Sequence, residues 1–186
     1  MNINLKAEIS LKRDFVSKEE EIFLAYIYTW QRAQKLGYKF FSSYQLSDAQ
    51  FNVLMILYDL KETGVYQHEL ASRLLVNRAT VGGLVGRLEK KGHVKRVQDA
   101  TDRRANLVHI TSRGEYLLLN IKKPYYALLA KTFDGFTKAD LESFLRWLNK
   151  YRKTVNHLMA NYKFPVKNSA PLRHNGSNRK TLMLKR

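Results

Sequence analysis

The sequence predicts a mainly α-helical protein with a small β-hairpin wing, an α+β chain with the pattern of a winged helix-turn-helix between terminal helices. Three observations predict this class: two short helical patterns separated by a turn, a hairpin pattern after the second, and longer helical patterns on both sides. We expect an N-terminal arm and helix over residues 1–46, the winged helix-turn-helix over 47–111, C-terminal helices over 112–162 and a basic disordered tail over 163–186.

The first helices are predicted from their capping residues. We expect residues 1–15 to form a loosely ordered arm. Ser17 and Glu20 then have the spacing of a capping box, which opens a long helix that continues to about residue 44. A second capping box at Ser47 and Gln50 opens another helix, which we expect to end near residue 62.

Two short helices at helix-turn-helix spacing are predicted next. Leu70 and Leu74 form the apolar stripe of the first helix, and residues 75–77 form a turn that ends in Asn77, a good N-cap. The second helix has a core-facing stripe at Val81, Leu84, Val85 and Leu88. Gly92 is placed to end it with a positive φ.

A hairpin with a charged tip follows Gly92. Residues 93–98 and 105–110 have the pattern of strands, and the tip between them carries Asp102, Arg103 and Arg104. Helix, turn, helix and hairpin in this order predict a winged helix.

Two further helices are predicted after the hairpin. Thr111 caps the first, and Pro124 should kink or break it, because proline lacks an N–H group and clashes with the preceding turn. Thr137 and Asp140 cap the last helix. Its apolar residues have roughly heptad spacing: Leu141, Phe144, Leu145, Leu148, Tyr151, Val155, Leu158 and Tyr162.

The charge balance favours a polyanionic partner. The 186 residues include 33 Lys and Arg against 16 Asp and Glu, a formal net charge of +17. Basic residues concentrate on the second short helix and the hairpin, which argues against the alternative of an unremarkable basic surface. The tail after Asn161 has no acidic residue, and it is either an inert end or an arm that binds phosphates.

Several kinds of chemistry are excluded or disfavoured. The absence of cysteine excludes disulfides, thiolate nucleophiles and thiol-based redox sensing. The histidines show no metal-ligand grouping, no nucleophile–base pair appears, and residues 82–87 lack the following Gly-Lys-Ser/Thr of a phosphate-binding loop. We expect no catalytic residue, no metal and no cofactor, and the lack of a long apolar run predicts a soluble protein.

Three segments carry a resemblance to a known family. LSDAQFNVLMIL (46–57), HELASRLLVNRATVGGLVGRLEKKGHVKR (68–96) and DATDRRANLVHITSRGEYLL (99–118) resemble the MarR family of bacterial transcription regulators, over roughly residues 14–161. The resemblance implies a cytoplasmic prokaryotic protein, nucleoid-associated when it binds double-stranded DNA. It also implies a homodimer whose dimerisation helices are the terminal ones; the alternative is that these helices fold back on their own chain.

The second short helix is expected to read DNA. Asn77, Arg78 and Thr80 lie at its N-terminus, where Arg78 can contact either a guanine edge or a phosphate. Arg87 is expected on the DNA backbone or as a brace for the helix. Gly83 lies on a face with several glycines, which either lets the helix backbone approach DNA closely or reflects drift tolerated by packing.

The hairpin tip is expected to contact the DNA as well. Arg104 matches the family arginine that enters the minor groove, and Asp102 matches the acidic neighbour that orients it. Lys95 and Arg103 are expected on phosphates, and the alternative for the whole tip is an exposed charged turn.

The resemblance also implies a small aromatic or phenolic effector. Tyr26, Trp30, Tyr38 and Phe41 are candidates for the walls of its site, although aromatic residues at helical spacing are more often core residues. Two functions remain open: a ligand-responsive, sequence-specific regulator that binds a pseudo-palindromic operator as a dimer, or an architectural, weakly specific DNA-binding protein that uses its basic surface and tail. An enzyme is not expected.

Overall fold

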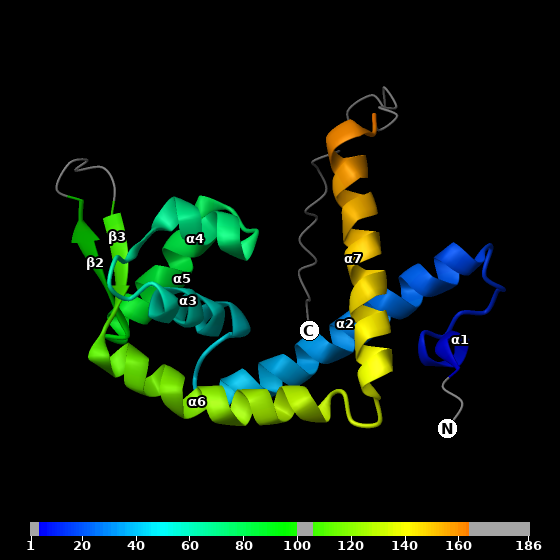
Figure 1. Ribbon diagram of the computed structural model, residues 1–186, viewed down its shortest axis with the longest axis horizontal. Coiled ribbons are helices and arrows are strands. Elements are labelled where there is room, and N and C mark those ends of the chain that lie inside the picture. The colour runs from blue at the N-terminus through cyan, green and yellow to red at the C-terminus, as the bar shows by residue number, and fades with distance from the viewer. Residues whose placement is uncertain (1–3, 100–105, 164–186) are drawn as a thin grey trace, which may run out of the picture. The chain divides into compact units, whose positions relative to one another are not determined.

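The computed structural model describes residues 4–99 and 106–163 of the chain. The chain divides into two compact units, Met1–Thr132 and Phe133–Arg186, and each is described by itself. The elements in chain order (Figure 1) are α1 (Leu5–Glu8), α2 (Lys18–Ser42), α3 (Asp48–Asp59), β1 (Val65–Tyr66), α4 (Gln67–Leu74), α5 (Arg78–Lys90), β2 (Val94–Gln98), β3 (Asn106–Ile110), α6 (Ser112–Lys131) and α7 (Lys138–Asn161).

The described part of the expected N-terminal arm contains one short helix and several local bonds. Asn4 caps the short helix α1, and Lys6 forms an ion pair with Asp14 at 2.6 Å. Arg13 pairs with Glu20, whose Oε2 also accepts a hydrogen bond from the Val16 backbone N–H at 2.6 Å. These bonds lower the pKa of Glu20 to about 2. Capping and ion pairs, which apolar spacing does not reveal, therefore give the segment local structure.

The predicted caps of α2 and α3 are largely confirmed. Ser17 accepts from the backbone N–H of Glu20, but the Glu20 carboxylate binds Val16 and Arg13, so only half of that capping box forms. At α3 the box is complete, because the Ser47 hydroxyl oxygen and the Gln50 side chain each accept from the other's backbone N–H, at 3.2 and 3.0 Å. Both helices begin where the sequence predicts.

A three-stranded antiparallel sheet forms beside the helices, in the order β1-β3-β2. In β2 and β3, Val94 pairs with Ile110 and Gln98 with Asn106, as the predicted hairpin requires. The short strand β1 adds to the other edge of β3, with Val65 opposite Val108. Strand β1 was not predicted from the sequence. We call β2, β3 and the segment that joins them the wing.

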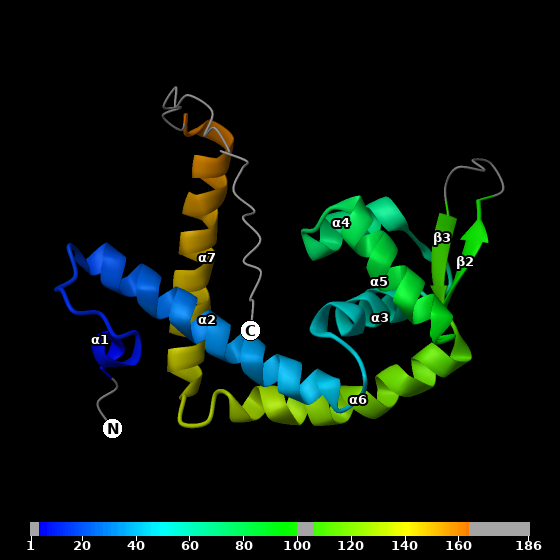
Figure 2. The same ribbon diagram turned by 180° about the vertical axis from the view of Figure 1, so that it is seen from behind.

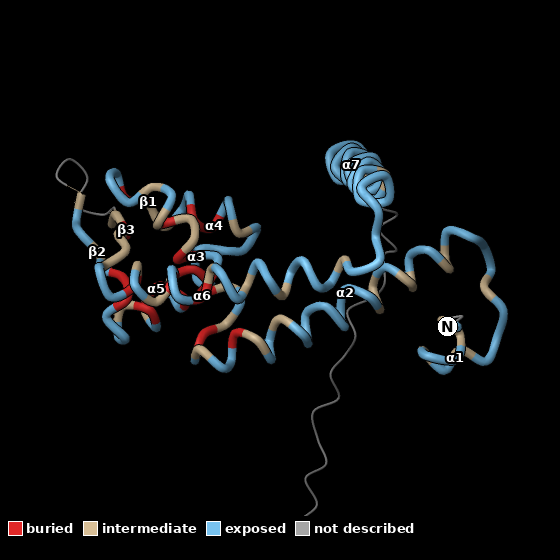
Figure 3. Tube along the Cα trace, turned by 60° about the horizontal axis from the view of Figure 1, so that its bottom comes forward, coloured by how far each residue is buried: buried red, intermediate tan, exposed pale blue. Residues whose placement is uncertain are grey.

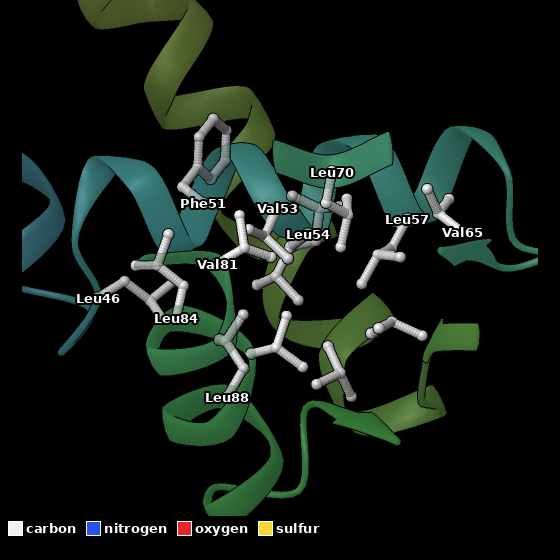
Figure 4. Packing of buried hydrophobic residues seen from close by; sticks show 14 of the residues in the cluster. Leu46, Phe51, Val53, Leu54, Leu57, Val65, Leu70, Val81, Leu84 and Leu88 are labelled. Atoms are coloured by element: carbon white, nitrogen blue, oxygen red, sulfur yellow. The ribbon is translucent and has the colours of Figure 1, made fainter. Parts of the chain in front are cut away.

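One apolar core holds the helix-turn-helix together. The predicted stripe of α5 is buried, and it packs with buried residues of α3 and α4 (Figure 4). Leu118 and Ile121 of α6 complete the core, and both are fully buried. Seen from behind, α5 lies with α3 and α4 on one side and the wing strands at its end (Figure 2). The buried residues concentrate here, whereas most of α2 is exposed (Figure 3).

Helix α6 is tied to the end of α5 through its cap. Thr111 caps α6, and its hydroxyl donates to the Gly92 carbonyl oxygen at 2.7 Å. The first turn of α6 lies so close to the α5–β2 turn that a Cβ at Gly114 would be 2.0 Å from the carbonyl oxygen of His93. Only glycine fits there. Gly92 has φ +72°, which confirms its expected role at the end of α5.

Pro124 does not break α6, contrary to one of the two expected outcomes. The helix continues to Lys131 and curves along its length (Figure 1). Pro124 and Asn120, whose carbonyl loses its helical partner, are both exposed, so water can hydrate the freed carbonyl.

The second unit contains α7. Thr137 and Asp140 form the predicted capping box. None of the residues of α7 is buried within the described chain. Its apolar stripe is therefore exposed except at Val155, which is half-buried.

Candidate nucleic-acid interface

The N-terminus of α5 is an exposed, capped helix end. The Asn77 side-chain oxygen accepts from the Thr80 backbone N–H at 2.8 Å and from the Thr80 hydroxyl at 2.9 Å. This confirms Asn77 as the N-cap, and it commits the hydroxyl proton of Thr80. Arg78 is exposed beside them. The helix end therefore offers a guanidinium, a methyl group and free backbone N–H groups to an anion or a base edge.

The exposed stripe of α5 runs opposite its buried stripe. Ala79, Gly83, Arg87 and Lys90 are exposed along it. The Arg87 guanidinium extends back over the glycine, since a Cβ at Gly83 would lie 3.4 Å from Arg87 Nη1. This places Gly83 and Arg87 on one surface with the N-terminus of the helix.

Gly82 and Gly86, the other two glycines of α5, do not lie on this exposed stripe, although helical spacing predicted one glycine face with Gly83. Gly82 and Gly86 are half-buried, and they face Gln67 and Arg96 respectively. Arg96 of β2 donates from Nη2 to the Gly82 carbonyl oxygen at 3.3 Å and forms an ion pair with Glu89. Only Gly83 therefore leaves the exposed stripe bare.

The structure places one of the four expected wing residues. Lys95 is exposed on β2, opposite His109 of β3. Asp102, Arg103 and Arg104 lie outside the described residues, and their roles stay predictions.

Tyr66 contacts the base of the wing, which the sequence analysis did not expect. It stands at the N-cap of α4 and makes no side-chain cap bond. Its hydroxyl donates to Asp99 Oδ2 at 2.5 Å, and its ring stacks on His68. The only signal in the sequence was the lack of a Ser or Thr at the N-cap.

Basic side chains dominate the α5 and β2 surface. Within residues 4–99 and 106–163, no carboxylate forms an ion pair with Arg78, Arg87, Lys90 or Lys95. Their charges are therefore available to a polyanion. The carboxylate of Glu89 is instead neutralised by Arg96.

A hollow of about 440 Å³ lies between the end of α2, the α5–β2 turn and the start of α6. It is lined by Tyr44, Gln45, Glu89, Lys90, Lys91, Gly92, His93, Arg113 and Leu117. His93 is buried, and burial, Arg113 and Lys91 lower its pKa. The surplus of cations makes the hollow suited to an anion.

The expected effector residues do not line this hollow. Phe41 is 5 % exposed and packs against Phe51, with ring centroids 4.8 Å apart, so it is a core residue. Tyr26, Trp30 and Tyr38 are 45 %, 52 % and 73 % exposed along α2. Phe41 is therefore a core residue, as the alternative to an effector site predicts. Tyr26, Trp30 and Tyr38 lie on an open helix surface.

Other classes of function would need features that the described residues lack. No group of three His, Cys, Asp or Glu residues within them could hold a metal ion. None of the helices in that part of the chain is long and apolar enough to cross a membrane.

Known proteins are similar to this chain in sequence and in fold. The MarR family model matches residues 44–105. The HTH-type transcriptional repressor YetL of Bacillus subtilis is 25 % identical over 128 residues, which cover 69 % of this chain and 77 % of YetL.

Solved structures share the fold as well. The S. aureus MepR–DNA complex superposes with a TM-score of 0.66 at 20 % identity, over 75 % of this chain and 99 % of MepR. The PcaV regulator of Streptomyces coelicolor, in complex with its natural ligand, superposes with a TM-score of 0.60 at 19 % identity, over 68 % of this chain and 91 % of PcaV. The family match over residues 44–105 and the similarity to HTH-type regulators support a MarR-family winged helix-turn-helix regulator, and the solved structures share its fold.

Proposed function

We propose that this protein is a cytoplasmic, sequence-specific DNA-binding transcription regulator that binds a pseudo-palindromic operator as a homodimer. The observation that carries the proposal is the exposed N-terminus of α5, where Asn77 fixes the helix end and Arg78 and Thr80 extend from a rigid core. The names of its relatives favour regulation over catalysis, since YetL is a transcriptional repressor and MepR was solved with DNA.

The chemistry of α5 fits a major groove. A helix can enter that groove, where an arginine such as Arg78 binds guanine O6 and N7 together. Thr80 presents its methyl group, which can contact a thymine methyl, because its hydroxyl proton is held by Asn77. Gly83 places no side chain between the helix backbone and the DNA. The Arg87 guanidinium, which lies over Gly83, can turn away from the glycine to bind a phosphate.

The exposed apolar faces support the homodimer. Ile22, Phe23 and Trp30 of α2 and Leu145 and Tyr151 of α7 are large apolar or aromatic residues that the described chain leaves exposed. Soluble proteins seldom leave such faces uncovered, and a second copy would cover them. A two-fold dimer would also present two copies of α5 to an inverted repeat.

An anionic aromatic effector is the proposed ligand. Lys91 and Arg113 in the hollow would pair with its anionic group, and Tyr44 would offer it an aromatic surface. The PcaV structure holds a natural ligand, which supports a ligand-responsive family member.

Selection of bound sequences from random duplex DNA tests the proposal. We expect enrichment of an inverted repeat whose half-sites lie about one helical turn apart. If roughly ten phosphates are contacted, the logarithm of the binding constant should fall with the logarithm of salt concentration with a slope of about −9. Retention of all sequences alike would favour an architectural protein instead.

A further inference from the structure

Helix α5 is fastened to strand β2 by Arg96, whose contacts run from Gly82 to Glu89. The Arg96 guanidinium pairs with Glu89 and donates to the Gly82 carbonyl oxygen at 3.3 Å. The Arg96 backbone N–H also donates to Glu89 Oε1, at 3.1 Å. A Cβ at Gly86 would lie 3.9 Å from Arg96 Nη2, so the guanidinium lies directly along the glycine flank of α5. Strand β2 thus has a bidentate connection to α5 through one glutamate.

The C-terminal end of β2 is fastened to α4 by Tyr66. The Tyr66 hydroxyl donates to the carboxylate of Asp99, which directly follows β2, at 2.5 Å. The Tyr66 ring stacks on His68 of α4, with centroids 5.4 Å apart and planes 20° apart. Serine or threonine would cap α4 at this position, but their side chains are too short to span this gap. Tyr66 therefore does not cap α4 with its side chain, and its hydroxyl binds Asp99 at the end of β2 instead.

These contacts matter because a winged helix touches DNA in two places. A recognition helix in the major groove and a wing at the neighbouring groove gain full affinity only when their spacing matches the duplex. A wing that moves freely would have to be ordered on binding, and that ordering lowers affinity. Hydrogen bonds to charged partners, such as Tyr66 to Asp99 and Arg96 to Glu89, are among the stronger ones in proteins.

We propose that Tyr66 and the Glu89–Arg96 pair are positioning residues that hold the wing and α5 in one fixed spacing, and so determine how strongly the wing contributes to operator choice. The inference rests on the proposed DNA-binding function. Tyr66 and Glu89 act through the wing and α5 and do not themselves contact the DNA.

The test uses the full chain and an operator that it selects from random DNA. Two forms of this operator are made, with the same half-sites but with A·T-rich or G·C-rich flanks, because a narrow A·T-rich minor groove rewards a wing arginine most. The variants are Tyr66→Phe, which removes one hydroxyl, and Glu89→Gln, which removes one charge. Matched controls are Tyr116→Phe, at a tyrosine that is 72 % exposed, and Glu62→Gln, at an exposed glutamate without an ion pair in the described chain.

We expect Tyr66→Phe and Glu89→Gln each to reduce the preference for A·T-rich flanks about tenfold, the equivalent of one lost charge-assisted hydrogen bond. Both controls should keep the wild-type preference. Glu62→Gln adds the same net charge as Glu89→Gln, so it accounts for any general gain in affinity for DNA. The preference is a ratio for one protein sample, so a partly unfolded fraction does not change it.

Two results separate the possible failures. If the wild-type protein selects no sequence, the proposed function is rejected. If it selects an operator but the folded variants keep its flank preference, the positioning role is rejected and the function stands. Should one variant fail to fold, the other decides the question, because Glu89 holds Arg96 in the middle of β2 whereas Tyr66 holds Asp99 just after its end.

Discussion

Replacement of Gly83 by alanine should make the free protein more stable and its DNA complex weaker. Gly83 lies inside α5 on the exposed stripe, where alanine is favoured over glycine by about 1 kcal/mol in a helix. The added Cβ would meet Arg87 Nη1 at 3.4 Å, and that atom is the far end of a flexible side chain. No part of the core opposes the substitution, so most of this stabilisation, up to about 1 kcal/mol, should appear in thermal or denaturant unfolding.

The same methyl group should oppose DNA binding if α5 enters the major groove with this stripe first. Forcing a methyl group into a well-packed contact typically costs about 1–3 kcal/mol, which corresponds to roughly a 5-fold to 150-fold loss of affinity. Gly83→Gln should lower affinity further. Opposite changes in stability and affinity would not be expected from a glycine retained by drift.

Gly86→Ala is the matched control for this prediction. It lies one turn away in α5, and its Cβ would face Arg96 at 3.9 Å rather than the exposed stripe. It should stabilise the protein to a similar extent while leaving DNA affinity close to wild type. Unfolding curves and DNA titrations decide the matter: if Gly83→Ala and Gly83→Gln bind DNA as well as wild type, the exposed stripe does not lie against the groove.

Three further predictions concern the wing, the tail and one buried histidine. Arg104→Ala should weaken binding most on A·T-flanked operators, whereas Lys95→Ala should weaken all sequences alike and reduce the salt slope by about one; an unchanged affinity for folded Arg104→Ala would exclude the minor-groove role. Removal of residues 168–186 should leave the melting temperature unchanged but lower both the DNA affinity and its dependence on salt concentration. An unaltered salt dependence would mean that the tail does not contact DNA. Burial and nearby cations lower the pKa of His93, so the unfolded chain binds the proton more readily and stability should fall as the pH drops below about 6.5. Melts at about pH 7.5 and 5.5 should show a smaller decrease for His93→Gln, and an equal decrease in both proteins would contradict this.

Local signals in the sequence were sufficient for most of the helices. Asn77, Ser47 and Thr137 each cap a helix where the sequence predicts one, because a cap bonds to backbone groups three residues away and needs no tertiary partner. The apolar stripe of α5 was equally clear, since one spacing determines which face is buried.

Features that depend on distant segments were missed. Strand β1 has two residues and no detectable period, and it forms because β3 offers it an edge. The hydrogen bond from Arg96 to the Gly82 carbonyl oxygen depends on how closely β2 approaches α5. The residue spacing within either segment does not predict that distance. Phe41 was a candidate for an effector site because helical spacing alone does not show which aromatic face the core covers.

The most direct test of the account compares the affinity of the protein for its selected operator with that for a scrambled duplex of equal length and composition, at one salt concentration. Contacts of Arg78 with base edges predict an operator preference of about a thousandfold or more, and Arg78→Ala should reduce this preference about tenfold. Equal affinity of the wild-type protein for both duplexes would contradict sequence-specific recognition by α5.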